Sequence, residues 1–243
     1  MKDFFIYGKH PCFTLLQNQK RKIKKIYTSN FDILNKFIEE NKININKNII
    51  EKKSNNEISN IIKENVNHQG FLILASERKK TTLDEFIEKE CKNKNNLPKL
   101  IILDQLTDPH NVGAIIRTAM AFGVKHIITT KFNSVNDSAI ITKTSTGLSE
   151  VIDIIEVVNV NNTIEELKKV GYFIIGMAGE AKTNIKTIKN PENLCLVIGN
   201  EGNGIRQLVK KNCDILVKIE MNEEVESLNA SVATAIAIYQ IWG

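Results

Sequence analysis

The chain has 243 residues and a formal net charge of +5, with 42% hydrophobic and 25% charged residues. This length and composition suit one large or two smaller folded domains that need no disulfide or metal to complete their cores. No segment reaches the ~18 apolar residues of a membrane span, and the first apolar run is too short for a signal peptide. Four cysteines without a Cys-x-x-Cys pair predict reduced thiols, no metal site and a cytoplasmic protein.

The basic excess belongs to the N-terminal part of the chain. Residues 1–99 carry 20 Lys and Arg against 12 Asp and Glu, whereas residues 100–243 carry 13 against 16. The densest basic cluster, which we expect to contact RNA, consists of Lys20, Arg21, Lys22, Lys24 and Lys25. Such a cluster binds a polyanion by releasing counterions, or it is a solvated face of a lysine-rich chain. The cluster by itself leaves both interpretations open.

Helical segments and branched apolar runs alternate in the first part of the chain. The predicted helices are Pro11–Gln17, Asp32–Glu40 and Glu57–Asn65, and the predicted strands are Ile23–Thr28, Ile43–Ile50 and Phe71–Leu74. This alternation predicts a small α/β domain over residues 1–76. Residues 77–98 are charged and are expected to form a linker that contains one helix between Leu83 and Cys91.

A second α/β unit is predicted over residues 99–243. Its expected strands are Leu100–Leu103, His126–Thr130, Ile152–Val157, Tyr172–Met177, Leu194–Ile198 and Ile215–Ile219. Its expected helices are Asn111–Phe122, Thr163–Val170, Ile205–Asn212 and a last helix that opens at Ser227 or Asn229 and reaches Trp242. The alternation predicts a mostly parallel sheet with helices on both faces and ligands at the carboxyl ends of the strands.

A glycine-rich turn follows the strand predicted at Leu194–Ile198. Its glycines, Gly199, Gly202 and Gly204, read G-x-x-G-x-G, the reverse of the dinucleotide fingerprint, although Glu220 lies near the distance that the fingerprint requires. Gly204 is followed by Ile and Arg rather than Lys and Ser or Thr, which excludes a Walker A site. A tight strand-to-helix turn is the simplest interpretation.

An arginine stands on an otherwise apolar helix. Gly113 and Arg117 are four residues apart and therefore share one helix face. A guanidinium among Ala, Ile and Met side chains is expected to find anionic partners, because a buried unpaired charge is costly.

Three ordered motifs resemble those of the SpoU (TrmH) family of RNA 2′-O-ribose methyltransferases. They are N-x-G-x-x-x-R-T-A-x-x-F-G at Asn111–Gly123, I-G-x-E-x-x-G at Ile198–Gly204 and S-L-N-x-S at Ser227–Ser231. The sequences at Asp108–Asn111, Gly176–Glu180 and His68–Gly70 are most similar to the RlmB-like branch, which methylates guanosine in large-subunit ribosomal RNA. The resemblance spans the whole chain.

The resemblance implies a C-terminal trefoil knot, a homodimer with sites at the subunit interface, and S-adenosylmethionine as cofactor. The knot would hold the cofactor largely through backbone at Gly199, Ile219 and Leu228, with Met177, Ala178, Gly179 and Met221 nearby. Residues 1–76 would bind RNA, and residues 99–243 would bind the cofactor and catalyse methyl transfer.

The resemblance also implies roles for polar residues. Arg117 would activate the ribose 2′-hydroxyl. Since guanidinium is effectively always protonated, positioning the 2′-oxygen and the adjacent phosphate is physically easier than general base catalysis. Glu201 would orient Arg117, and Asn111, Ser227 and Asn229 would complete a polar network.

One segment departs from the family pattern. Where the family has I-P-M-x-G, this chain has Ile219-Glu220-Met221-Asn222-Glu223, and Glu224 and Glu226 follow. Because this acidic loop lies at the rim of the expected cofactor pocket, a catalytically silent RNA-binding paralogue is a second interpretation of the chain. A methyltransferase that acts on transfer RNA and an NAD-dependent oxidoreductase also remain open.

Overall fold

The computed structural model describes residues 3–18, 20–93, 96–132, 138–188, 192–222 and 224–243. The chain forms two compact units. The first comprises residues 1–79 together with 137–151, and the second comprises residues 80–136 and 152–243. The short segment 137–151, which the sequence predicts to lie in the second domain, thus belongs to the first unit.

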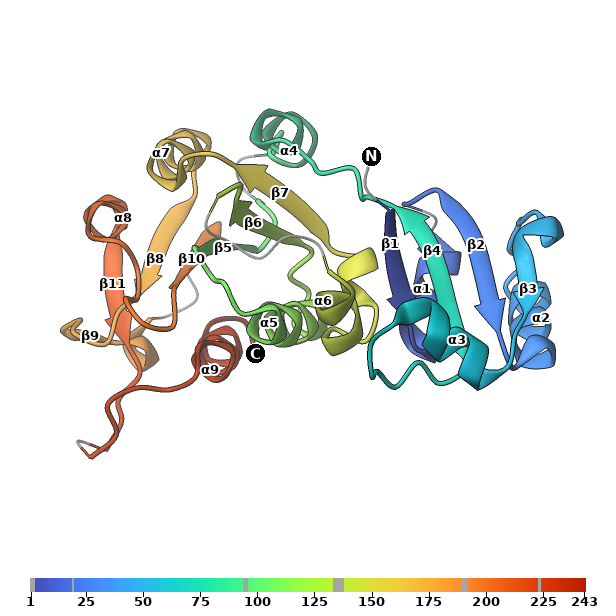
Figure 1. Cartoon of the computed structure of the whole chain (residues 1–243). Coiled ribbons are helices and arrows are strands. Elements are labelled where there is room, and N and C mark those ends of the chain that lie inside the picture. The colour runs from blue at the N-terminus through green and yellow to red at the C-terminus, as the bar shows by residue number, and fades with distance from the viewer. Residues whose placement is uncertain (1–2, 19, 94–95, 133–137, 189–191, 223) are drawn as a thin grey trace. The chain divides into compact units, whose positions relative to one another are not determined.

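A four-stranded mixed sheet forms the centre of the first unit (Figure 1). Its order is β1-β4-β2-β3, in which β4 is antiparallel to β1 and β2, and β3 is parallel to β2. The strands are β1 (Asp3–Tyr7), β2 (Ile23–Thr28), β3 (Ile50–Lys52) and β4 (Phe71–Ser76). The predicted small α/β domain is confirmed as a fold.

Helices pack on both faces of this sheet. They are α1 (Lys9–Asn18), α2 (Phe31–Glu40), α3 (Asn55–Ile62) and α6 (Ala139–Thr144). Leu15, Leu16 and Leu34 of α1 and α2 pack with Ile26 on one face. On the other face Ile58 of α3 packs with Tyr7 and Leu72. Helix α3 begins at a capping box between Ser54 and Glu57, which satisfies two backbone groups at its N-terminus.

Seven parallel strands form the sheet of the second unit (Figure 1), in the order β7-β6-β5-β10-β8-β11-β9. They are β5 (Leu100–Asp104), β6 (His126–Thr130), β7 (Asp153–Val157), β8 (Phe173–Met177), β9 (Thr183–Asn184), β10 (Leu194–Gly199) and β11 (Ile215–Lys218). The prediction of a parallel sheet is confirmed. The two-residue strand β9 was not predicted, because it is too short to form a periodic pattern.

Helices cover this sheet as a second and third layer. They are α4 (Leu83–Glu90), α5 (Pro109–Ala121), α7 (Val160–Val170), α8 (Gln207–Asn212) and α9 (Ala230–Trp242). Figure 1 shows α4 and α7 on one side of the sheet and α5 and α9, which pack together, on the other. Strand order alone does not determine how the chain is threaded, so the trefoil knot stays a prediction.

Helix α4 packs against the core of the second unit. Its Phe86 is fully buried, and it lies in one cluster with Leu97, Ile155 and Leu167. Among the described residues, no helix is long and apolar enough to cross a membrane.

Candidate functional site

The carboxyl ends of four adjacent strands meet at one edge of the larger sheet. Gly199 at the end of β10 pairs with Asp104 at the end of β5, and Val197 pairs with Gly176 of β8. Val217 of β11 in turn pairs with Met177 of β8. The segments that follow these strands therefore lie next to one another, which is where a parallel sheet places its ligands.

The glycine-rich turn folds tightly back on the end of β10. Backbone bonds join Asn200 and Gly204 in both directions, with N–O distances of 3.1 and 2.9 Å. A Cβ atom on Gly199 would lie 2.1 Å from the carbonyl carbon of Gly204 and from the nitrogen of Ile205. Gly204 itself has φ +65°. Position 199 therefore needs glycine, because any side chain would separate the turn from the strand.

An ion pair between the buried Asp104 and the exposed Arg206, which no local sequence pattern predicts, fixes this turn. The carboxylate of Asp104 is fully buried, and it accepts hydrogen bonds from Nε and Nη2 of Arg206 at 2.9 and 2.6 Å and from the Arg206 backbone nitrogen at 3.2 Å. The turn is also tied to β5 by Asn200, whose Nδ2 donates to the carbonyl of Gln105 at 2.8 Å. The sequence shows Asp104 at the end of an apolar strand and Arg206 in a turn. Because the two are 102 residues apart, no local pattern indicates that they pair.

Three of the predicted catalytic residues form one hydrogen-bonded chain. Nδ2 of Asn111, which is buried on α5, donates to Oε1 of Glu201 at 2.9 Å, and Oδ1 of Asn111 accepts from Nδ2 of Asn229 at 2.9 Å. Oδ1 of Asn229 accepts from the backbone nitrogen of Ser231 at 2.9 Å and so caps α9. Asn111 thus links the glycine-rich turn to the start of the last helix.

Arg117 and Ser227 lie outside that chain. Both are exposed, and no ion pair joins Arg117 to Glu201 in the described part of the structure. The predicted pairing of Glu201 with Arg117 is thus not seen among the described residues, and the role of Arg117 stays a prediction. Its guanidinium projects from α5 into water, where it costs nothing to leave unpaired, and the Glu201 carboxylate bonds Asn111 instead.

The residues predicted to hold the cofactor follow β8 and β11. The backbone nitrogen of Ala178 donates to the carbonyl of Val217 at 2.9 Å, which ties the two strand ends together. Ala178 is buried, and a Cβ on Gly179 would meet no atom within 4 Å. In the segment after β11 the predicted residues are half-buried: Ile219, Met221 and Leu228. Leu228 immediately precedes Asn229, so it lies beside the Asn111 network.

The acidic segment that replaces the family's proline and glycine has its own local structure. Oε2 of Glu220 accepts from Nδ2 of Asn184 at 2.9 Å. Asn222 forms a turn in which its Oδ1 accepts from the nitrogen of Glu224 at 3.0 Å and its carbonyl from the nitrogen of Val225 at 3.0 Å. Glu224 and Glu226 are exposed, and Glu223 lies outside the described residues. The turn is thus made by an asparagine instead of a glycine.

In the first unit the predicted basic cluster divides into paired and exposed cations. Lys24 pairs with Asp3 at 2.7 Å and Lys25 with Glu51 at 2.5 Å. Nζ of Lys20 donates to the carbonyl of Val151 at 2.7 Å. Lys22 is exposed. Because these four ammonium groups remain at least partly open to solvent, the structure is compatible with an RNA contact by them, and that contact stays a prediction.

Arg21 corrects the predicted RNA-binding set. Its side chain is buried, and Nε and Nη2 donate to the two oxygens of Glu150 at 2.7 and 2.9 Å. Arg78 donates to Glu150 as well, at 3.2 Å. A guanidinium enclosed with a fully buried carboxylate does not face a nucleic acid, so Arg21 has a structural role here.

No group of three or more His, Cys, Asp or Glu side chains in the described ranges could hold a metal ion. The candidate site comprises backbone at the strand ends, the Asp104–Arg206 pair, the Asn111 network and the exposed Arg117.

Comparison with known families adds an independent observation. Residues 98–239 match the SpoU rRNA methylase family, and residues 5–81 match a family described as the substrate-binding region of RNA 2′-O ribose methyltransferases. A TrmH-family protein of the tRNA/rRNA methyltransferase class from Staphylococcus haemolyticus is 39% identical over 178 residues, which are 73% of this chain and 71% of the relative.

Solved structures share the fold. An S-adenosylmethionine-bound rRNA methyltransferase from Sinorhizobium meliloti superposes with a TM-score of 0.77 at 20% identity, over 98% of this chain and 86% of the other. The SpoU methyltransferase AviRb from Streptomyces viridochromogenes superposes with a TM-score of 0.76 at 19% identity, over 98% and 88%. At these identities the likeness establishes the architecture.

Proposed function

Because this chain belongs to the SpoU family and is an S-adenosylmethionine-dependent RNA 2′-O-methyltransferase, we propose that it methylates the ribose of a guanosine in large-subunit ribosomal RNA. The proposal for the target depends on the sequence Asp108–Asn111, which matches the rRNA-guanosine branch, and on the substrate-binding region at residues 5–81. The observation that carries the function is the Asn111 network, since it joins the motif residues of all three family motifs at the carboxyl edge of the sheet.

The strand ends suit a cofactor that is held through backbone. The open space beside Gly179 leaves room for a ligand at the end of β8, and Gly199 lets the turn pack tightly at the end of the neighbouring strand β10. We assign the cofactor to these two glycines with Met177, Ala178, Ile219, Met221 and Leu228 around it. S-adenosylmethionine supplies an electrophilic methyl group on a sulfonium centre. The protein needs only to hold it in line with the attacking oxygen.

Arg117 is assigned to the substrate. Its exposed guanidinium presents several donors in a fixed plane, which suits the 2′-oxygen and the phosphate next to it. In this assignment Arg117 positions the nucleophile and stabilises developing negative charge, and the Asn111 network with Glu201 and Ser227 shapes the surface that the ribose contacts.

We further propose that the protein is a homodimer that acts in the cytoplasm. The last helix exposes an apolar stripe at Val232, Ile236 and Tyr239, whose side chains are 47%, 40% and 68% exposed. Their spacing of four and three residues puts them on one face of α9. A second copy of the same stripe would cover it, and it would place Arg117 of the neighbouring helix α5 near the subunit interface.

The experiment that tests the function combines cofactor binding and methyl transfer. The purified protein should bind S-adenosylhomocysteine at about one site per subunit by calorimetry, and it should transfer labelled methyl groups from S-adenosylmethionine to a large-subunit rRNA transcript. Arg117→Ala should abolish transfer while the affinity for S-adenosylhomocysteine stays within about twofold. Full activity of that variant would remove Arg117 from the mechanism.

Two outcomes would redirect the proposal. Transfer to tRNA transcripts instead of rRNA would keep the chemistry and change the substrate, which the name of the Staphylococcus relative leaves open. A folded protein that binds RNA but not S-adenosylhomocysteine would be the catalytically silent paralogue, with the acidic segment around Glu220, Glu224 and Glu226 blocking the pocket.

A further inference from the structure

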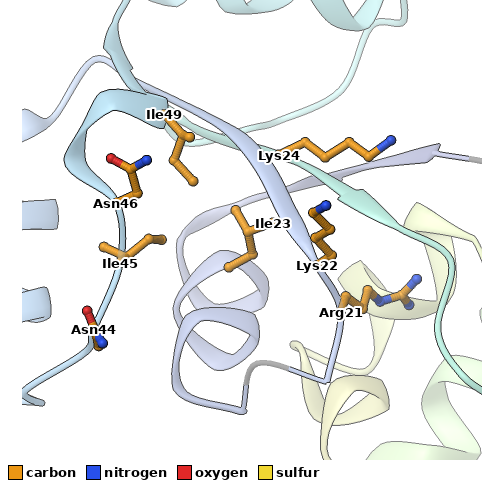
Figure 2. Close-up of a pocket in the computed structure, with 8 residues that line it drawn as sticks. All are labelled: Arg21, Lys22, Ile23, Lys24, Asn44, Ile45, Asn46 and Ile49. Atoms are coloured by element: carbon orange, nitrogen blue, oxygen red, sulfur yellow. The ribbon is translucent and has the colours of Figure 1, made fainter.

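An open pocket of about 620 Å³ lies beside the first half of β2 in the first unit (Figure 2). It exists because β3 pairs with β2 only from Ile26 onward, where Ile26 is opposite Ile50. Before that point the chain forms a short 3-10 helix, Lys47–Ile49, with Asn46 as its N-cap. Among the described residues, the backbone from Ile23 to Lys25 therefore has no strand partner on that side.

The pocket has an apolar floor. Figure 2 shows the side chain of Ile23 directed toward the segment that carries Ile45, while Arg21 and Lys24 extend away from that segment. Ile49 completes the floor. A β-bulge lies beside this pocket, since Lys24 is an extra residue between the pairs Ile23–Ala75 and Lys25–Leu74.

The polar side chains that line the pocket offer mainly hydrogen-bond donors. No Asp or Glu is among the described residues that line it. Oδ1 of Asn46 accepts from the nitrogen of Asn48 at 3.0 Å, so the free end of the Asn46 side chain is its amide NH₂ group. Lys22 is exposed, and its ammonium has no partner in the described structure, whereas Lys24 is paired with Asp3.

A second open pocket of about 480 Å³ is lined by part of the same segment. The two share Asn44, and the second is lined by Lys42 and Ile43. Residues 41–49 thus run along a groove with exposed lysines at Lys22, Lys42 and Lys47. An apolar floor with lysines at its rim matches a chain that has regularly spaced anions and flat apolar units between them.

We propose that this groove, defined by Ile23, Ile45, Ile49, Asn46, Lys22 and Lys42, binds an unpaired nucleotide segment of the substrate RNA. The inference rests on the proposed function, because it takes RNA as the substrate. Lys22 and Lys42 contact phosphates, a base or ribose packs on the three isoleucines, and the Asn46 amide donates to a base edge. Bases in a duplex are stacked and paired, so they cannot reach such a floor, and the groove selects single-stranded RNA.

Charge decides between RNA and an extended peptide as the occupant of this groove. A peptide can add to an unpaired strand edge through backbone hydrogen bonds. The lysines along this groove instead favour a polyanion, whose binding releases counterions.

The test uses the full-length protein and a fluorescein-labelled single-stranded RNA of about 12 nucleotides, with a duplex of the same sequence beside it. Lys22→Gln with Lys42→Gln removes two charges and keeps the stems, and should weaken single-strand binding about tenfold and lower the salt slope by roughly 1.4. Asn46→Asp keeps the helix cap but replaces the amide donor with a carboxylate, and should weaken binding about fivefold. Lys63→Gln is the matched control, because Lys63 is the exposed C-cap of helix α3, which covers the other face of the sheet.

The groove variants should also raise KM for an rRNA transcript while kcat and S-adenosylhomocysteine affinity stay unchanged. The groove proposal would be wrong if the groove variants bound single-stranded RNA as tightly as Lys63→Gln does. It would also be wrong if the wild-type protein bound the duplex as tightly as the single strand. If the wild-type protein methylates rRNA and the variants bind normally, the groove alone is wrong. If the wild-type protein methylates no RNA, but the groove variants bind single-stranded RNA more weakly than the wild type does, the groove proposal holds and the proposed enzymatic function fails.

Discussion

At the scale of single residues, Asn111 connects more of the site than any other side chain in the described network. It donates to Glu201 and accepts from Asn229, so one buried amide holds the glycine-rich turn against the last helix. Neither bond can be replaced by water without opening the site, because Asn111 is buried. Its substitution should therefore disturb activity more than stability.

We predict that Asn111→Ala lowers kcat for methyl transfer at least about tenfold, with a stability loss of about 1 to 2 kcal/mol for the two lost hydrogen bonds. Asn212→Ala is the control, because it removes another amide–amide bond, to Asn161 at 3.0 Å, away from the site. Steady-state kinetics and urea unfolding measure the two effects. Equal loss of activity in both variants would mean that Asn111 acts only through stability.

His68 sets a pH dependence in the first unit. Burial lowers the pKa of His68 below its ordinary value, and the charge of Lys143 lowers it further. Its Nδ1 accepts from the nitrogen of Gly70 at 3.0 Å, a bond that protonation would break. Because the unfolded chain takes up this proton near pH 6.5 and the folded chain only at lower pH, the stabilisation is complete above about pH 6.5 and is lost as the pH falls below it.

The prediction is that the free energy of unfolding decreases between pH 7.5 and 5.5 less in His68→Gln than in the wild type. Urea unfolding at several pH values measures it. His110→Gln, at an exposed position, is the control and should keep the wild-type slope. A slope unchanged by His68→Gln would show that this imidazole does not titrate differently on unfolding.

At the scale of elements, α9 has one buried and one exposed apolar face. Ala237, Ile238 and Ile241 are buried against the unit, whereas Val232, Ile236 and Tyr239 are exposed. A helix that is apolar nearly all round is expected to be covered on every side. The proposed partner for the exposed face is a second copy of the chain.

We predict that Ile236→Glu converts the proposed dimer into a monomer, because it places a charge in an apolar contact. Sedimentation velocity measures the mass. Val158→Glu serves as the control, since Val158 is 71% exposed elsewhere on the second unit and should leave the mass unchanged. A dimer that survives Ile236→Glu would place the interface on another surface.

At the scale of the whole molecule, the segment 137–151 joins the first unit although both neighbouring stretches of the chain belong to the second. The carboxylate of Glu150 explains the assignment. It is fully buried and bonds Arg21 and Arg78, which would otherwise be enclosed without a countercharge. Thr142 and Ser149 complete its hydrogen bonds at 3.4 Å each.

We predict that Glu150→Gln destabilises the first unit by about 3 kcal/mol, because two arginines keep their buried charges and lose their counterion. Glu156→Gln removes a carboxylate from a partly exposed pair with Lys80 and should cost less than about 1 kcal/mol. Thermal unfolding of both variants decides. A fragment of residues 1–79 should for the same reason be less stable than one that also receives the 137–151 segment.

The positions of most strands and helices could be predicted, because apolar runs and capping residues are local signals. Helix boundaries were less accurate. The helix predicted from Thr163 begins at Val160, because Asn159 is the N-cap that accepts from Asn161 and Asn162, and Thr163 bonds back to the Asn159 carbonyl. The helix predicted from Asn111 begins at Pro109 with Asp108 as its cap. A chain offers several possible caps, and packing selects one.

The candidate site divides in the same way. Asn111, Glu201 and Asn229 were named from motifs, and the structure brings them together. The predicted pairing of Glu201 with Arg117 is not seen among the described residues, since Arg117 is exposed and Asn111 takes the Glu201 carboxylate. The Asp104–Arg206 pair was missed because no local pattern links residues so distant in sequence. Arg21 was assigned to RNA because its neighbours are basic, whereas its partner Glu150 lies 129 residues away.

The sequence by itself determined the two α/β sheets, the family, the glycine-rich turn and the identity of the network residues, since each depends on residue types at fixed local spacing. Only the tertiary structure decided which charges are buried together and which remain exposed. It showed that Arg21 is enclosed with Glu150, that Arg206 holds the turn through Asp104, and that β3 pairs with only the second half of β2. These features depend on contacts between distant segments, because the tertiary fold, and not proximity in the sequence, decides which charged side chains lie close enough to pair.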